Sequence, residues 1–281
     1  MLLSLTTSTT ATAFCRKTTC KPEETDCATD ARGCVTSGNP LVWKKLPLSF
    51  RFSSVRPGPL LREEARAAIR AAFYRWSDAL CGPDQRRTSL RFVEGEEIPG
   101  EKPHTAGAQA SEPYGIFFRE RGWPYEGKAD STLAQTNTFF GKESGTILYA
   151  DIEINTGTMR FSTKEEPTGI DLQAVITHEV GHYIGLDHSR EPDSIMTVSY
   201  CEGETRCQKG KIAARTLADD DLAAVCAIYP PDLDLGADPA PARADCSSGR
   251  RPSIPSTPIA GVGAALVIAA TWRRRRRSPR G

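Results

Sequence analysis

The sequence predicts an α+β domain in which a mixed sheet packs against two long helices and a small helical subdomain follows. Short segments of alternating apolar and polar residues indicate strands, and two longer segments have helical periodicity. No internal repeat interrupts this order. Strands and helices arranged in this way are typical of a layered α+β fold. With 281 residues, of which 39% are hydrophobic and 25% charged, the chain can hold one core plus terminal segments.

The expected elements follow one another in a clear order. Residues 47–53 alternate apolar and polar side chains, which is the period of a half-buried strand. Residues 59–80 carry an apolar stripe with helical spacing, and the Cys-Gly-Pro sequence that follows is expected to end this helix. The further expected strands are 88–93, 114–119, 132–140 and 146–155, and the further helices begin near Asp171 and span about 217–229.

One short stretch concentrates the residues that can bind a metal ion, since it holds three of the four histidines. His178 and His182 are four positions apart, so on a helix they share one face and can reach a single ion. Glu179 lies on the neighbouring flank, where it can contact a water on that ion without being a ligand. His188 would lie roughly 9 Å along a continuous helix. The helix must therefore break, and Gly185 can take the left-handed conformation that a break requires.

Three neutral imidazoles with an open fourth position are the ligand set of a catalytic zinc ion. The spacing H-E-x-x-H-x-x-G-x-x-H fixes five positions, each for a separate geometric reason. The alternative is three surface histidines on an amphipathic helix. The remaining histidine, His104, lies in a Pro- and Gly-rich stretch and is expected to be a solvated loop residue. The sequence therefore predicts one catalytic zinc ion.

The net charge of +1 conceals an asymmetry along the chain. Residues 246–281 contain eight arginines and no acidic residue, which leaves 28 of the 36 Lys and Arg against all 35 Asp and Glu in the rest of the chain. An acidic body argues against a nucleic-acid-binding surface. We therefore expect no nucleic acid as a partner, and we expect a monomer.

Nine cysteines indicate an exported protein with disulfides. If Cys246 is set aside, eight remain, which is enough for four disulfides. Cys201 and Cys207 are expected to close a small loop, and the other pairings are not deducible. The alternative is a second zinc ion held by thiolates, but the sequence has no C-x2-C pair. The remaining cysteines are Cys15, Cys20, Cys27, Cys34, Cys81 and Cys226.

The segments around the expected domain, residues 46–230, differ from it in composition. Residues 1–13 have a short apolar core and an A-x-A site, which favour an export signal that starts upstream of Met1, over a disordered Thr-rich terminus. Residues 14–45 form a Cys-rich extension, and residues 231–258 a Pro-rich linker. Residues 259–281 form a tail. It begins with an uncharged apolar run, 259–272, which is shorter than the roughly 20 residues of a membrane span. The arginines at 273–277 follow and would stay on the cytoplasmic side. A nucleic-acid-binding basic patch is the alternative for these arginines.

The histidine stretch and the segments after it resemble the matrixin family of metzincin zinc peptidases. H-E-V-G-H-Y-I-G-L-D-H-S resembles the zinc signature of the family, including Ser189 after the third histidine. S-I-M-T-V-S-Y resembles the Met-turn, which would place Met196 beneath the metal. The spacing of apolar and acidic residues in 217–229 resembles the closing helix of the family. The close resemblance covers about residues 171–229.

The resemblance implies a metzincin catalytic domain with a twisted, mostly parallel five-stranded sheet, an antiparallel edge strand, and a C-terminal subdomain with a Met-turn and a final helix. It also implies a zinc metalloendopeptidase in which Glu179 is the general base. An extended peptide would pair with the edge strand, with Leu133 and Ala134 nearest the cleft. The segment from Met196 to Tyr200 would line the pocket for the side chain after the cut bond.

The sequence also departs from the family. Only His104 is available for the second, structural zinc ion of animal matrixins, so we expect a single zinc. Calcium is left open, because no matching loop supports it. Residues 81–84 superficially resemble the family's latency motif but follow a helix inside the domain. The tail resembles a MYXO-CTERM sorting tail, with Cys246 before the apolar run and the arginines. Two alternatives remain: a weak or inactive zinc-binding surface module of the same fold, and a cell-surface structural protein.

Overall fold

The structure is a computed structural model that describes residues 14–22, 25–100, 115–123, 125, 131–164, 169–198 and 213–233. All of these belong to one compact unit, Met1–Asp238. The expected signal segment (1–13), nearly all of the linker and the whole tail (259–281) lie outside the described residues. In the part of the chain that is described, no helix has both the length and the hydrophobicity needed to cross a bilayer.

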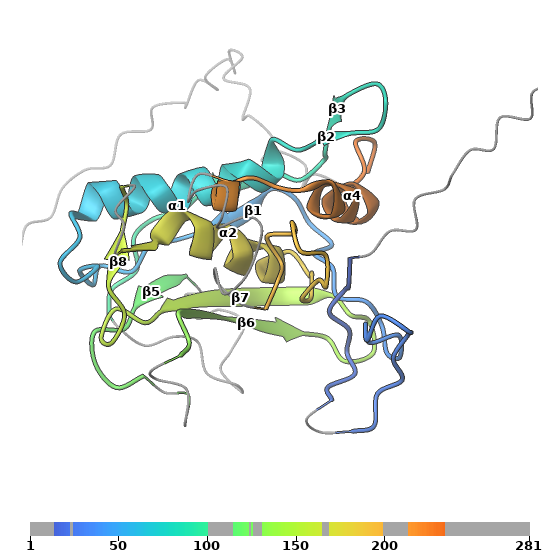
Figure 1. Cartoon of the computed structure of the whole chain (residues 1–281), viewed down its shortest axis with the longest axis horizontal. Coiled ribbons are helices and arrows are strands. Elements are labelled where there is room, and N and C mark those ends of the chain that lie inside the picture. Colours follow the sequence, from blue (N-terminus) through green and yellow to red (C-terminus); the bar gives the residue numbers. More distant parts are fainter. Residues whose placement is uncertain are drawn as a thin grey trace, which may run out of the picture. The chain divides into compact units, whose positions relative to one another are not determined.

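The sheet has a continuous three-stranded part and a two-stranded part. The continuous part has the order β5 (Ile116–Phe118), β7 (Ile147–Ile154) and β6 (Ala134–Phe140). β5 runs parallel to β7, and β6 pairs antiparallel to β7 at the edge of this part (Figure 1). The two-stranded part is β1 (Leu48–Phe50) paired in parallel with β4 (Phe92–Glu94).

The two parts meet just beyond β1, where Phe52 forms a parallel bridge with Ile116 of β5. The Ser53 amide donates to the Ile116 carbonyl at 3.0 Å, and the Ile116 amide donates to the Arg51 carbonyl at 2.8 Å. Followed through this bridge, the strand order is β4-β1-β5-β7-β6, with β6 as the antiparallel edge. The predicted α+β class is confirmed, although the hydrogen-bonded ladder is continuous over only three strands.

Two long helices lie on one side of the three-stranded part (Figure 1). α1 (Arg62–Ser77) forms because its apolar residues recur every three or four positions and so share one face. α2 (Leu172–Tyr183) lies between α1 and the sheet, and Asp171 caps it by accepting from the Ala174 amide at 3.0 Å. The α1 residues that are fully buried are Ala65, Ile69, Ala72, Phe73 and Trp76.

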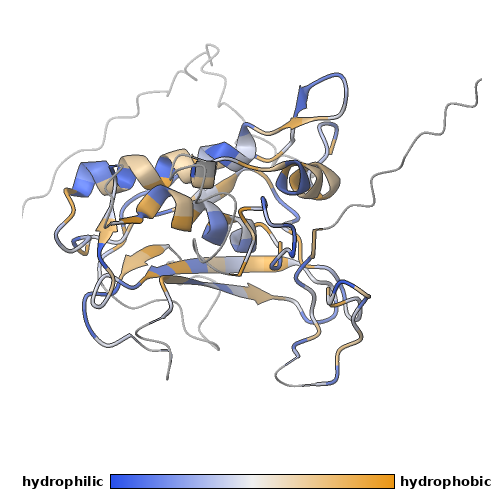
Figure 2. Ribbon diagram, in the orientation of Figure 1, coloured by the Kyte–Doolittle hydropathy of each residue, from blue (hydrophilic) through white to orange (hydrophobic). Residues whose placement is uncertain are grey.

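The core fills the space between these layers. Figure 2 shows β5 as hydrophobic, whereas hydrophobic and hydrophilic residues alternate along α1 and α2. Phe50 of β1 stacks on Phe73 of α1 with ring centroids 4.3 Å apart. The Trp76 indole donates to the Thr177 carbonyl at 2.8 Å, which ties α1 to α2 just before His178. The core begins before residue 46, since Leu41 and Trp43 are also buried.

Cys81 has a different role from the one expected. Helix α1 ends at Ser77 rather than near residue 80, so the Cys-Gly-Pro sequence does not end it. Cys81 belongs instead to a small hairpin of β2 (Leu80–Cys81) and β3 (Arg86–Arg87), and Gly82 has a φ of +66° at its turn. The Cys81 side chain forms a disulfide with Cys226 of α4 (Asp219–Ile228), the last described helix.

Two further disulfides lie in the N-terminal extension, by which we mean described residues of 14–39. Cys15 pairs with Cys34, and Cys20 pairs with Cys27. The expected Cys201–Cys207 loop and Cys246 lie outside the described residues. The remaining short elements are β8 (Phe161–Ser162), β9 (Ile170–Asp171) and the 3₁₀ helix η1 (Ala213–Arg215).

Candidate metal centre

The three histidines of the predicted site converge in space. His178 and His182 lie on α2, and His188 returns to them after the helix has ended. One potential ligand atom from each imidazole lies within 4.8 Å of the others. The Nε2 atoms of His182 and His188 are 3.2 Å apart. The chain therefore gathers three nitrogen ligands around one point.

The helix ends at Gly185 in the way that brings His188 back. Gly185 has a φ of +101°. Its amide donates to the His182 carbonyl at 3.1 Å, and the Leu186 amide donates to the Gly181 carbonyl at 2.9 Å. This pair of bonds is a Schellman ending, which favours glycine. A Cβ at position 185 would also lie 2.5 Å from the Leu41 carbonyl oxygen, so both conformation and space require glycine here.

Backbone carbonyls fix the orientation of two imidazoles. Nδ1 of His178 lies 2.7 Å from the Ile195 carbonyl, and Nδ1 of His182 lies 2.9 Å from the Leu186 carbonyl. A carbonyl only accepts, so Nδ1 carries the proton and donates. The lone pair is then on Nε2, which faces the centre of the cluster.

Burial keeps the three imidazoles neutral. It lowers the pKa of His178 and of His188 to about 4, and it lowers the pKa of His182 well below the ordinary value of 6.5. Neutral imidazole is the form that binds a metal. Two nitrogens bound tetrahedrally to zinc at 2.0–2.1 Å would be about 3.3 Å apart, which is close to the observed 3.2 Å. The donor set therefore fits a zinc ion.

Glu179 lies beside this cluster with only 6% of its surface exposed. The Thr136 hydroxyl on the edge strand β6 lies 2.5 Å from Oε2 of Glu179 and 3.0 Å from its backbone carbonyl. Burial raises the pKa of Glu179, and the hydrogen bond from Thr136 opposes that rise. The resemblance places Thr136 on the expected substrate edge, 132–136, but its contact with Glu179 was not predicted, because no spacing connects the two residues.

Met196 is 2% exposed and packs against Gly181, the residue before His182 on α2. Its sulfur lies against the backbone of Gly181, where there is no room for a side-chain carbon. The Ser189 amide donates to the Met196 carbonyl at 2.9 Å, which joins this residue to the His188 turn. Gly181 is a residue that the sequence reasoning missed. The available signal was a glycine inside a helix, placed between two ligands.

The first turn of α4 holds the segment between His188 and Met196. Ser189 Oγ donates to Asp220 at 2.8 Å, and Ser194 Oγ donates to Asp221 at 2.6 Å. Asp221 also accepts from the Ile195 amide at 2.9 Å. In the sequence these aspartates belong to the spacing of 217–229 that resembles the closing helix of the family, which does not reveal their partners. In the structure they bind the segment that carries the carbonyl partner of His178.

Of the residues expected near a substrate, Leu133 and Ala134 are described and lie at the start of β6. Ala134 is the first residue of β6 and is 7% exposed. Leu133 precedes it, packs against the core, and accepts the Asn155 amide at 2.9 Å. Tyr200 lies outside the described residues.

The N-terminal extension supports the turn at Gly185, a contact that the sequence did not predict. The Lys17 amide donates to the Gly185 carbonyl at 3.0 Å, and the Asp187 amide donates to the Cys15 carbonyl at 3.0 Å. Between them, Arg16 and Leu186 form an antiparallel bridge. The extension therefore forms one β-bridge with the turn that carries His188.

Comparison with known proteins agrees with this geometry. The family model described as Matrixin matches residues 42–230. Matrix metalloproteinase-C of Caenorhabditis elegans is 29% identical over 206 residues, covering 72% of this chain and 31% of that protein. Matrix metalloproteinase-25 of Homo sapiens is 31% identical over 163 residues, covering 57% and 25%. Metalloendoproteinase 5-MMP of Arabidopsis thaliana is 28% identical over 192 residues, covering 66% and 44%. The chain thus spans less than half the length of these relatives.

Proposed function

The chain belongs to the matrixin family, and from this we propose that it is a zinc-dependent endopeptidase acting on extracellular proteins. One observation carries the proposal: three neutral imidazoles face one point, and the buried carboxylate of Glu179 lies beside them. The ligand set leaves a fourth position open, which is the arrangement of a catalytic rather than a structural zinc site.

Each residue of the site has a defined task in this proposal. When bound, zinc supplies Lewis acidity, which acidifies a water molecule and polarises a peptide carbonyl. His178, His182 and His188 hold the ion through Nε2. The Thr136 hydroxyl donates to Oε2 of Glu179, which leaves Oε1 to take a proton from the attacking water and pass it to the leaving amine.

The substrate is proposed to bind as an extended peptide along β6. An edge strand offers unpaired backbone groups, and a peptide can add to it as a further strand. Thr136 joins β6 to Glu179, so a peptide on this edge passes the general base. Leu133, Ala134 and Tyr200 are proposed to contact the residues around the cut bond, with Met196 as the floor beneath the metal.

Cleavage of an unfolded protein by the full chain tests the proposal. We expect Glu179→Ala to lower kcat/KM by about 100- to 10,000-fold, the usual contribution of a general acid–base group. Removal of metal with a chelator should abolish cleavage, and added zinc should restore it. Equal cleavage by the wild type and Glu179→Ala would contradict the mechanism. Zinc binding without cleavage by the wild type would favour the alternative, an inactive zinc-binding surface module.

We also propose that the protein is exported and held at the cell surface by its tail. Three described disulfides support an oxidising compartment. Residues 1–13 would direct export, and residues 259–281 would anchor the chain. Deletion of 246–281 should move protein from the cells to the medium. An unchanged distribution would contradict anchoring.

A further inference from the structure

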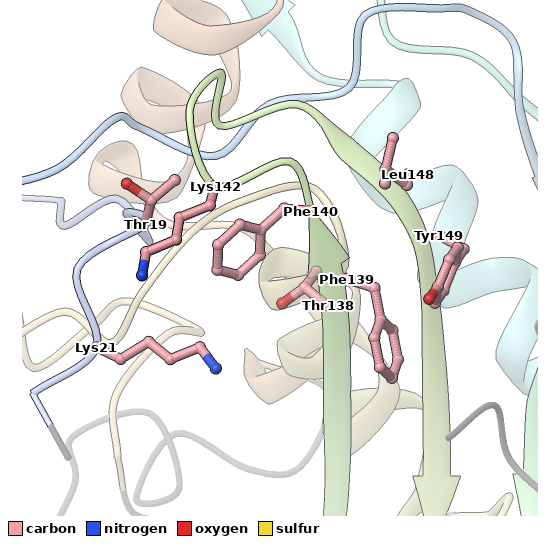
Figure 3. Close-up of a pocket in the computed structure, with 8 residues that line it drawn as sticks. All are labelled: Thr19, Lys21, Thr138, Phe139, Phe140, Lys142, Leu148 and Tyr149. Carbon is pink, nitrogen blue, oxygen red and sulfur yellow. The ribbon is translucent and has the colours of Figure 1, made fainter. Parts of the chain in front are cut away.

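A pocket of about 290 Å³ lies where the N-terminal extension meets the end of β6 (Figure 3). The extension, β6 with the turn after it, and β7 all contribute to its lining. In Figure 3 the side chains from the extension lie across the pocket from those of β6. The lining includes Thr19 and Lys21 of the extension, Thr138 and Phe140 of β6, Lys142 of the turn, and Tyr149 of β7.

Hydrogen bonds fix the extension in this place. The Thr19 amide donates to the Asn39 carbonyl at 2.9 Å, and the Asn39 amide donates to the Thr19 hydroxyl at 3.0 Å. The Asn39 side chain in turn donates to the Glu143 carbonyl in the turn after β6, at 3.1 Å. The disulfide between Cys20 and Cys27 closes the chain beside Lys21. The extension therefore forms a built wall of the pocket.

This wall is an addition to the matched domain. The family match begins at residue 42, after the extension. The segment 16–21 of this wall carries Arg16, Lys17 and Lys21 and no acidic residue, whereas three acidic residues follow between Cys20 and Cys27. Lys17 lies close enough to the metal centre for its charge to lower the pKa values of the three histidines and of Glu179. Positive charge therefore extends along the extension from the metal centre toward the pocket.

The pocket combines cationic and apolar groups. Lys21 and Lys142 supply two ammonium groups, and Thr19 and Thr138 supply hydroxyls. Aromatic rings form part of the remaining lining, with the rings of Phe139 and Tyr149 centred 4.5 Å apart. A side chain with a short apolar stem and a terminal carboxylate matches these groups, because its charge would meet the ammonium groups while its stem contacts the rings.

The position of the pocket relates it to the proposed cut site. Thr136 contacts Glu179, and Thr138 and Phe140 follow two and four residues later on β6. At about 3.3 Å per residue, these positions lie roughly 7 and 13 Å along the strand. A peptide paired with β6 advances by the same rise. The pocket would therefore meet a residue two to four positions from the scissile bond.

We propose that this pocket is a subsite of the peptide-binding cleft that receives a glutamate or aspartate side chain two to four residues from the cut bond. The proposal rests on the proposed peptidase function and specifies its substrate class, peptides with an acidic residue on one side of the scissile bond. The extension supplies one of the two lysines, so the preference depends on a segment outside the matched family domain.

Two measurements on the full chain test this subsite. In the first, a peptide library is digested and the residues around each cut are counted for the wild type and for Lys21→Glu/Lys142→Glu. The second measures peptide binding to the Glu179→Ala protein, with and without Lys21→Glu/Lys142→Glu. The two peptides compared differ only in having glutamate or glutamine at the position preferred in the first measurement. Lys164→Glu is the matched control, since Lys164 lies 3.9 Å from Glu64 of α1 rather than in the pocket.

We expect the wild type to favour an acidic residue on one side of the cut by about threefold to tenfold, in line with exposed ion pairs, and the preference to weaken at high salt. The double reversal should switch it to lysine or arginine, while Lys164→Glu should keep it. The subsite would be overturned if the wild type showed no preference for any residue around the cut, or if its acidic preference survived the double reversal. A third outcome separates the two proposals. The wild type cleaves no peptide, yet the glutamate peptide binds better than the glutamine peptide and loses this advantage in the double reversal. The proposed peptidase function then fails and the subsite stands.

Discussion

Helix α2 and the N-terminal extension meet at Gly185, yet the sequence reveals them very differently. The histidines of α2 that could hold a metal ion are readable from their spacing, because one turn of helix fixes which side chains share a face. The extension shows only its cysteines. Its place behind the His188 turn depends on backbone bonds from Lys17 and Cys15, and any residue other than proline could form them. Local periodicity thus identifies a site, and long-range backbone pairing determines what supports it.

Gly185→Ala tests the residue at which α2 and the N-terminal extension meet. The substitution puts a side chain at a φ of +101° and within 2.5 Å of the Leu41 carbonyl oxygen. We expect a loss of about 4 kcal/mol or more of unfolding free energy, because strain and a backbone clash combine. Denaturant unfolding and zinc content would measure it.

The matched control is Gly82→Ala. Gly82 also has a positive φ, +66°, but a Cβ there meets nothing within 4 Å. It should cost only about 1–2 kcal/mol, the price of the left-handed conformation alone. Similar losses for the two variants would contradict the role of the contact with Leu41.

The two disulfides of the extension test whether it supports the His188 turn. Cys15→Ser/Cys34→Ser releases the residue whose carbonyl binds the Asp187 amide. We expect a loss of about 3 kcal/mol of unfolding free energy and zinc affinity weakened by about tenfold, the usual scale for groups that support metal ligands. Isothermal titration with zinc would measure the affinity.

Cys20→Ser/Cys27→Ser is the control for this pair. It opens a disulfide in the same extension, but no described bond joins Cys20 or Cys27 to the His188 turn. Zinc affinity should stay within about twofold of the wild type, well inside the tenfold scale for groups that support metal ligands. Equal weakening by the two double variants would mean that the extension supports the fold in general and not the turn.

Gly181→Ala tests the local side of the comparison, because two principles predict opposite signs. Helix propensity alone predicts a gain of about 1 kcal/mol for alanine over glycine. The structure predicts a loss of about 2 kcal/mol, since the new carbon would overlap the Met196 sulfur and crowd Trp76. Thermal unfolding decides the sign. A gain in stability would show that Met196 can move away at little cost.

Thr136→Val should have the smallest effect, on the pH dependence of cleavage. Glu179 acts as a base only when ionised, so activity falls as pH drops through its pKa, which burial raises. Thr136 lowers that pKa by hydrogen bonding, so its removal should move the acidic limb of kcat/KM up by about one pH unit. Thr156→Val, which removes a hydroxyl without a partner among the described residues, should leave the limb unchanged. If the acidic limb of kcat/KM does not move in Thr136→Val, Thr136 does not set the pKa of Glu179.

Much of the fold was predictable because it follows from short-range patterns. The expected helix 59–80 and the expected strands 132–140 and 146–155 lie within a few residues of α1, β6 and β7. The break at Gly185 was predictable because a continuous helix would carry His188 away from its partners. The positions of the three imidazoles therefore followed from the chain alone.

The contacts around the site were not predictable, for a physical reason. Thr136 reaches Glu179 only because β6 packs under α2, and Asp221 binds Ser194 only because α4 returns to the His188 turn. Each contact joins segments far apart in sequence, and no spacing rule links them. Cys81 illustrates the same limit, since its neighbours suggested a helix end while its partner lies 145 residues away.

The covalent link between Cys81 and Cys226 encloses β6, β7, α2 and the three converging histidines. If one peptide bond between these cysteines is cut, the two pieces stay joined through sulfur. A nicked molecule would migrate as an intact chain in a gel without reductant and as two fragments with it. For a protein proposed to cut other chains in an oxidising space, a single self-inflicted nick would therefore leave its metal ligands tethered to one another.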